Sequence, residues 1–192
     1  MNGRFRNVNE QLQPGIQTVA EVAARKGVAL DIRYLAAAAC APEELAAALD
    51  AELGQIVTTM VFVAPRPEGR VAPIVCLVSG LNEVDLGLLA AVTGEVSVRA
   101  ATSRETREIT GFGVGSIPPF GLGRNVRVLM DEDLCRYQWI WAPAGSEDAV
   151  MRVFPGTLRM LSNATVEPLA AATWLAATSG RLTLSFEAGA GA

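Results

Sequence analysis

The sequence of 192 residues contains no histidine. This absence excludes an imidazole general base, a Ser-His pair and any metal site with histidine ligands. Lysine is almost absent as well, because Lys26 is the only lysine among 16 basic residues. The net charge of −4 argues against a protein that binds polyanions with its whole surface. A local arginine patch that contacts an RNA backbone stays compatible with this composition.

Cysteines and long apolar runs are also scarce. Cys40, Cys76 and Cys135 are widely spaced, odd in number and without a C-x-x-C motif, so we expect buried thiols in a reducing compartment. No run reaches the roughly 18 apolar residues of a membrane-spanning helix. The first residues lack the apolar core of an export signal. We therefore expect a cytoplasmic protein with no membrane segment.

Short helical and strand-like patterns alternate along the chain and predict one α/β domain of α+β type, with a mixed, mostly antiparallel twisted sheet or partial barrel flanked by helices. The expected domain covers 15–170, between an N-terminal arm at 1–14 and a C-terminal extension at 171–192. Expected helices cover 16–26, 42–53, 84–92 (with Leu86, Leu89 and Ala90 facing inward), 103–110 and 155–161. Expected strands cover 28–34, 56–63, 72–79, 96–98, 126–130, 137–141, 149–154 and 182–186.

The segment 111–123 is unusual because it combines five glycines and two prolines with apolar residues such as Phe112, Ile117 and Phe120. Its composition excludes regular helix or sheet, and its apolar residues argue against a solvated linker. Glycines let backbone N–H groups approach a ligand closely, and prolines fix the shape of the loop. The segment is therefore either a ligand-binding loop or a rigid loop without a function.

Several short segments between Pro42 and Ala170 occur in the order found in the YbaK/prolyl-tRNA-synthetase-associated domain, an aminoacyl-tRNA editing family that the chain resembles. These segments are GQIV at 54–57, LVSG at 77–80, VDL at 84–86, ITGF at 109–112, GSIPPFG at 115–121, LMDEDL at 129–134 and WAPAGS at 141–146. The resemblance implies the family's fold and a trans-acting hydrolase that removes the amino acid from the CCA end of a mischarged aminoacyl-tRNA. It also implies that the reaction uses neither a metal nor a cofactor.

The resemblance also implies a set of site residues. The family's G-x-x-x-P loop corresponds to Gly115–Pro119, and in the family it lies against the aminoacyl group and the terminal adenosine. The implied catalytic positions are Gly115, Ser116 and Thr58. The implied substrate contacts are Ile117, Pro118, Pro119, Gly121, Gly145, Ser146 and Asp148. Alternatively, Glu147 and Asp148 are only solvated turn residues.

The sequence departs from the family pattern at three positions. Thr58 stands where many members have a lysine, and a threonine has neither the charge nor the reach of that side chain. Pro143 and Val150 stand where some members have a serine and an aspartate. These changes support an alternative function, a non-catalytic member that binds an aminoacyl-adenosine-like ligand or a tRNA end. Strand alternation places Thr58 on one face with Ile56, Met60 and Phe62, and Thr59 on the opposite face. Alternatively, therefore, Thr58 is a buried, hydrogen-bonded core residue and not a ligand.

Three further groups have two interpretations each. Trp139 and Trp141 share one face of a strand, where they either stack on a base or, as the spacing favours, pack inward. The acidic triplet 131–133 looks like a metal cluster but is more typical of a turn or helix N-cap. The arginines after the glycine-rich segment are candidates for phosphate contacts: Arg124, Arg127 and Arg136.

Overall fold

The computed structural model describes residues 13–36, 41–123 and 126–170. Its α-helices are α1 (Pro14–Arg25), α2 (Pro42–Leu49), α3 (Leu86–Thr93), α4 (Ser103–Thr110) and α5 (Pro155–Ser162). Its strands are β1 (Asp31–Tyr34), β2 (Val57–Pro65), β3 (Val71–Ser79), β4 (Arg99–Ala100), β5 (Arg127–Asp131), β6 (Ile140–Ser146), β7 (Ala149–Val153) and β8 (Thr165–Glu167). Short 3₁₀ turns cover η1 (Leu53–Gln55), η2 (Pro67–Gly69) and η3 (Glu132–Arg136).

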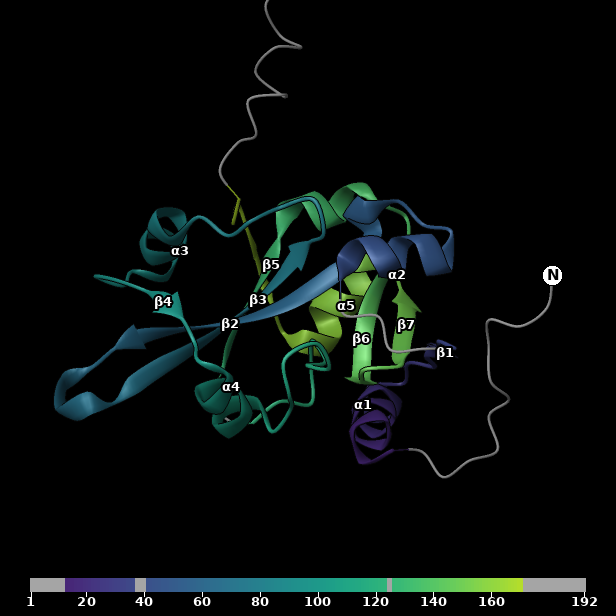
Figure 1. Cartoon of the computed structure of the whole chain (residues 1–192), viewed down its shortest axis with the longest axis horizontal. Helices are drawn as coiled ribbons and strands as arrows, with labels where there is room; N and C mark the ends of the chain where they lie inside the picture. Colours follow the sequence, from purple (N-terminus) through teal and green to yellow (C-terminus); the bar gives the residue numbers. More distant parts are fainter. Residues whose placement is uncertain (1–12, 37–40, 124–125, 171–192) are drawn as a thin grey trace, which may run out of the picture.

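The strands form two sheets, which confirms the predicted mixed α/β fold (Figure 1). The larger sheet has the order β4-β2-β3-β5-β8, and the smaller has the order β1-β7-β6. The hairpin β2–β3 and the pairs in the smaller sheet are antiparallel, whereas β5 pairs in parallel with both β3 and β8. The two sheets meet at a parallel bridge between Ile56 and Trp141, and within the described ranges β2 and β6 do not pair with each other beyond it.

Three apolar clusters hold the layers together. The largest contains residues from both sheets, from α1 and from α5, among them Val19, Leu77, Met151 and Leu158, all fully buried. A second cluster packs Leu89 of α3 against the outer face of the larger sheet. A third packs α2 against the smaller sheet around Trp141. Burial of this apolar surface provides the main driving force for folding.

Helix α4 begins at a capping box formed by Thr102 and Glu105. The amide of Glu105 donates to the Thr102 hydroxyl at 3.2 Å, and the amide of Thr102 donates to the Glu105 carboxylate at 2.9 Å. Arg99 donates to the same carboxylate at 2.7 Å. The Arg99 guanidinium, followed by the Thr102 contacts, lowers the pKa of Glu105 to about 2. The start of α4 is therefore well fixed.

Some predicted boundaries were wrong. Helix α1 begins at Pro14 rather than after Gly15, because a proline is well suited to the first helical position. Helix α2 ends at Leu49, where Asp50 takes a left-handed conformation with φ of 53°, so it does not continue to residue 53. The strand expected from residue 137 begins only at Ile140, because η3 precedes it.

Other predictions failed on burial. Leu86 is 45% exposed and does not face inward. The strand expected at 96–98 is absent there, where Val96 is fully exposed, and the short strand β4 follows at Arg99–Ala100. The sequence did not predict strand β8. Cys135 is exposed, whereas Cys76 is buried in β3 as expected. The strand expected at 182–186 and Cys40 lie outside the described residues. Within the described ranges, no helix is long and apolar enough to span a bilayer.

Candidate functional site

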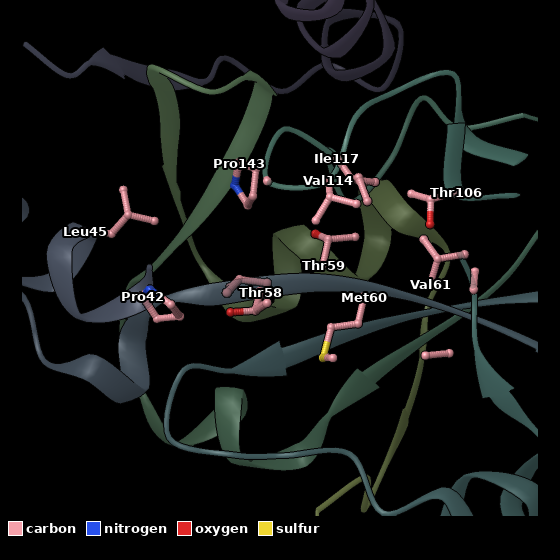
Figure 2. Close-up of a pocket in the computed structure, with 14 residues that line it drawn as sticks. Pro42, Leu45, Thr58, Thr59, Met60, Val61, Thr106, Val114, Ile117 and Pro143 are labelled. Carbon is pink, nitrogen blue, oxygen red and sulfur yellow. The ribbon is translucent and has the colours of Figure 1, made fainter. Parts of the chain in front are cut away.

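A cavity of about 280 Å³ lies along β2, where β2 and β6 separate (Figure 2). Its volume is close to the lower end of the range for small-ligand sites, about 300 Å³ and above. Strand β2 provides the floor, Pro143 comes from β6, and the glycine-rich segment and α4 close the opposite side. The lining residues are Pro42, Leu45, Val57, Thr58, Thr59, Met60, Val61, Ala100, Ala101, Thr106, Val114, Gly115, Ile117 and Pro143.

None of these lining residues has an ionisable side chain. Thr58, Thr59 and Thr106 provide the only side-chain polar atoms, and the other side chains are apolar. Cys76 lies in the neighbouring strand and faces another core cluster. Its burial, with a smaller contribution from Asp131, raises the pKa of this thiol to about 12. Chemistry in the cavity therefore depends on backbone groups, threonine hydroxyls and shape.

The glycine-rich loop has a fixed shape at the cavity. Gly115 has a φ of 91°, a conformation that side chains of L-residues rarely adopt. The Ser116 amide and the Ser116 hydroxyl both donate to the Gly113 carbonyl, at 3.2 and 3.1 Å. Ile117 is only 2% exposed and belongs to the main core. The loop thus presents Gly115 on a buried, hydrogen-bonded support.

Three of the predicted site residues line the cavity together: Thr58, Gly115 and Ile117. Ser116, Pro118 and Pro119 are buried in the same loop but do not line the cavity. Gly121 lies against α1, since a Cβ on Gly121 would be 3.1 Å from the Cγ2 of Thr18.

The turn between β6 and β7, which carries Gly145, Ser146 and Asp148, does not line the cavity. It lies at the start of α1, where a Cβ on Gly145 would come within 2.7 Å of the Gly15 backbone. The hydroxyl of Ser146 donates to the Asp148 carboxylate, which also accepts a bond of 3.4 Å from Gln13. These contacts hold the turn against α1.

The two tryptophans differ. Trp141 is 6% exposed and packs in the core, as the spacing favoured. Trp139 is half-buried and stacks on Phe154, with a distance of 3.6 Å between ring centroids. The acidic triplet is a cap as expected, because the Asp131 carboxylate accepts from the Asp133 amide at 3.2 Å. Within the described ranges, no group of three acidic or cysteine side chains could hold a metal.

The arginines proposed for phosphate contacts have other partners. Arg127 donates to the Thr93 carbonyl at 2.7 Å, Arg136 pairs with Asp133 at 2.7 Å, and Arg124 lies outside the described residues. Sequence reasoning missed Arg107, whose Nη2 atom lies 3.5 Å from where a Cβ on Gly113 would be. It is exposed, and no ion pair of Arg107 occurs within the described ranges. The sequence signal that could have identified Arg107 is its position in the expected helix 103–110, just before the glycine-rich loop.

The remaining lining residues were also missed, notably Thr59 and Thr106. Sequence reasoning placed Thr59 on the strand face opposite Thr58 and considered only Thr58. Both residues line the cavity because the edge of β2, and not one of its faces, borders it.

Comparison with known proteins gives consistent results. A family model described as an aminoacyl-tRNA editing domain matches residues 36–161. A crystal structure described as a candidate trans-editing enzyme for prolyl-tRNA synthetase is 36% identical, with a TM-score of 0.75 over 84% of this chain and 99% of that one.

Two curated proteins are also similar. A candidate Cys-tRNA(Pro)/Cys-tRNA(Cys) deacylase, EbsC of Enterococcus faecalis, is 26% identical over 63% of this chain and 71% of its own length. The proline–tRNA ligase of Aquifex aeolicus is 33% identical over 48% of this chain but only 15% of the ligase. The chain thus corresponds to a small part of that ligase.

Proposed function

The chain belongs to the aminoacyl-tRNA editing domain family, and on this premise we propose that it is a trans-acting deacylase that hydrolyses the ester of a mischarged aminoacyl-tRNA. One observation carries this proposal: the uncharged cavity formed by β2 and the Gly115 loop, which is suited to an acyl group and not to a metal or an ionised side chain. The names of the similar EbsC protein and of the similar trans-editing structure support the same reaction. The expected partner is the CCA end of tRNA in the cytoplasm.

In the proposed reaction, water adds to the ester carbonyl carbon, and the carbonyl oxygen becomes an oxyanion. The bond to the ribose oxygen then breaks, the ribose oxygen takes up a proton, and free amino acid and tRNA result. Preorganised backbone N–H groups at the cavity wall stabilise the oxyanion. Since no lining side chain is ionisable, the neighbouring ribose hydroxyl of the tRNA is the proposed proton carrier. The Ser116 hydroxyl holds the loop turn closed.

The cavity wall suggests which amino acids are removed. Leu45, Ile117 and Pro143 provide an apolar surface, and the lining has no charge to pair with a charged side chain. Burying an unpaired charge is unfavourable, so acidic and basic amino acids are excluded. The small volume favours alanine, cysteine or serine over larger residues.

Arg107 is the proposed phosphate contact. It lies beside the Gly113 turn on α4, whose residue Thr106 lines the cavity. A guanidinium suits phosphate geometry, and that of Arg107, which has no ion pair within the described ranges, is available for the terminal nucleotide. Arg107 would therefore supply from α4 the positive charge that Thr58 does not supply from β2.

A direct experiment measures the hydrolysis of alanyl-, cysteinyl- and seryl-tRNA(Pro), with prolyl-tRNA(Pro) as the cognate control. We expect at least one mischarged substrate to be hydrolysed well above its spontaneous rate. The Val114→Trp variant, at a lining side chain that is 65% exposed, should lower that rate at least tenfold. The matched control Val96→Trp alters a fully exposed site that does not line the cavity and should leave the rate unchanged.

The uncharged lining also favours the second candidate function, a non-catalytic member that binds the charged end of tRNA. Thr58→Lys distinguishes the two. If the wild-type protein hydrolyses none of the substrates and the lysine variant does, the non-catalytic function is correct. Hydrolysis by the wild-type protein excludes it.

A further inference from the structure

We propose that the free edge of β2 at Thr59 binds the aminoacyl group as if it were a single residue of an added strand. This inference rests on the proposed function and specifies how the same cavity holds its substrate. It assigns the orienting contacts to a residue that the glycine-rich loop does not include.

The pairing of β2 leaves this edge open. On one side β2 pairs with β3 along its whole length, from Val57 to Pro65. On the other side it pairs with β4 only at Phe62 and Val63. The bridge from Ile56 to Trp141 closes the opposite end. Between these points the edge of β2 has no partner strand within the described ranges, and residues 57–61 line the cavity instead.

The hydrogen-bond pattern shows which peptide groups face this edge. The amide of Ala101 donates to the Val61 carbonyl at 2.9 Å on the β4 side. The amide of Gly80 donates to the Ile56 carbonyl at 2.8 Å on the β3 side. Because alternate residues of a strand direct their peptide groups to the same edge, Thr59 shares the edge of Val61. The N–H and C=O of Thr59 therefore face the cavity.

The side chain of Thr59 adds a second and independent observation. Its Oγ1 atom is buried and has no hydrogen-bond partner among the residues that the structure describes. Leaving a buried polar group unsatisfied costs about 1–3 kcal/mol, so such an atom calls for a partner. In Figure 2 the Thr59 side chain points toward Val114, across the cavity. A ligand in the cavity would supply the missing partner.

An aminoacyl ester has the matching groups in the matching order. Its amino nitrogen, α-carbon and carbonyl repeat the pattern of one peptide residue. The amino group would donate to the Thr59 carbonyl, and the ester carbonyl would accept from the Thr59 N–H, as in a hydrogen-bonded pair of an antiparallel ladder. When water adds to the ester, the same N–H faces the oxyanion. The Thr59 hydroxyl is a further acceptor for the amino group.

Non-hydrolysable ligands test this arrangement without requiring turnover. The two probes are 3′-alanylamino-3′-deoxyadenosine and its propionylamino counterpart, which lacks only the amino group. We expect the wild-type protein to bind the propionyl probe at least tenfold more weakly, because it has no donor for the Thr59 carbonyl. Equal affinities for the two probes would overturn the proposal. If neither probe binds, the edge at Thr59 is not an aminoacyl site, and the proposal is again refuted.

A protein variant tests the N–H separately. Thr59→Pro removes an N–H that faces the open edge of β2 and makes no bond to β3, and a strand tolerates proline where its N–H faces an open edge. We expect deacylation to fall about 100-fold, as for loss of one oxyanion donor, with tRNA binding within threefold of wild type. Deacylation at the wild-type rate would contradict the role of Thr59.

Thr59→Val, which retains the peptide groups and removes the hydroxyl, is the control that stays informative if the proline variant does not fold. It should bind the alanyl probe about threefold to tenfold more weakly and the propionyl probe unchanged. An equal loss for both probes would show that the hydroxyl has only a packing role. If no mischarged tRNA is hydrolysed while the wild-type protein still binds the alanyl probe more tightly than the propionyl probe, the deacylase function is refuted and the aminoacyl site at Thr59 is supported.

Discussion

Gly115 and Gly145 have nearly the same backbone φ, 91° and 90°, and lie in very different surroundings. Both come from sequence segments that suggested ligand contacts. Gly115 lines the cavity beside β2. Gly145 lies against Gly15 at the start of α1, where even a Cβ would overlap the backbone.

The difference shows that a glycine with positive φ serves two unrelated purposes. At Gly145 the missing side chain allows two parts of the chain to touch, which is a packing requirement. At Gly115 it allows a loop to present its backbone to an open space. The positive φ is the same in both cases, and the tertiary contacts distinguish the two glycines.

The largest expected effect is that of Gly145→Ala on stability. The new Cβ would meet the Gly15 backbone at 2.7 Å in addition to the strain of a positive φ. We expect a loss of about 3–5 kcal/mol in the free energy of unfolding from the two penalties together. Urea denaturation measures it. Gly27→Ala is the control, because Gly27 has a φ of 73° with nothing within 4 Å, and it should lose only about 1 kcal/mol.

Gly115→Ala should act mainly on activity. The strain of its positive φ would shift the backbone at the cavity wall, and a shift of about 1 Å in a reacting group can lower a rate about 100-fold. We expect deacylation to fall between tenfold and 100-fold, while the free energy of unfolding falls by only about 1–2 kcal/mol. Steady-state kinetics and urea denaturation of the same variant separate the two. An unchanged rate would place the acyl site elsewhere.

Arg107→Ala should have a moderate effect on tRNA binding. We expect an increase of about threefold to tenfold in KM. The slope of log binding constant against log salt concentration should become shallower by the amount that about one phosphate contact contributes. Titration at several salt concentrations measures both. The control Arg104→Ala lies on the same helix, where Arg104 already pairs with Glu108 at 2.8 Å. Equal effects of the two variants would show that Arg107 has no special role.

Ser146→Ala should have the smallest effect on the reaction. Its hydroxyl donates to Asp148 in the turn beside α1, away from the cavity lining. We expect a change of less than twofold in the deacylation rate. A loss of tenfold or more would place this turn in the site and remove the contrast with Gly115.

Features set by neighbouring residues were predictable from the sequence. The capping box at Thr102 and Glu105, the helix start at Pro42 and the irregular segment 111–123 all depend on local geometry. Gly115 and Thr58 were predicted as site residues through the family resemblance. Both do line the cavity.

Features set by distant contacts were not predictable. The contact of Gly145 with Gly15 depends on how the smaller sheet lies on α1, and β8 depends on a parallel partner. Thr59 was not predicted as a site residue, because the alternation of side chains along a strand indicates only which face each residue lies on. The cavity borders an edge, where peptide groups and not the alternating side chains decide what a ligand meets.

The most direct test is a crystal structure of the protein with 3′-alanylamino-3′-deoxyadenosine. The alanyl group is predicted to lie in the cavity between β2 and the Gly115 loop, with its carbonyl oxygen within hydrogen-bond distance of the Thr59 N–H. A ligand bound at the β6–β7 turn, or a cavity that stays empty at saturating ligand concentration, would contradict this site.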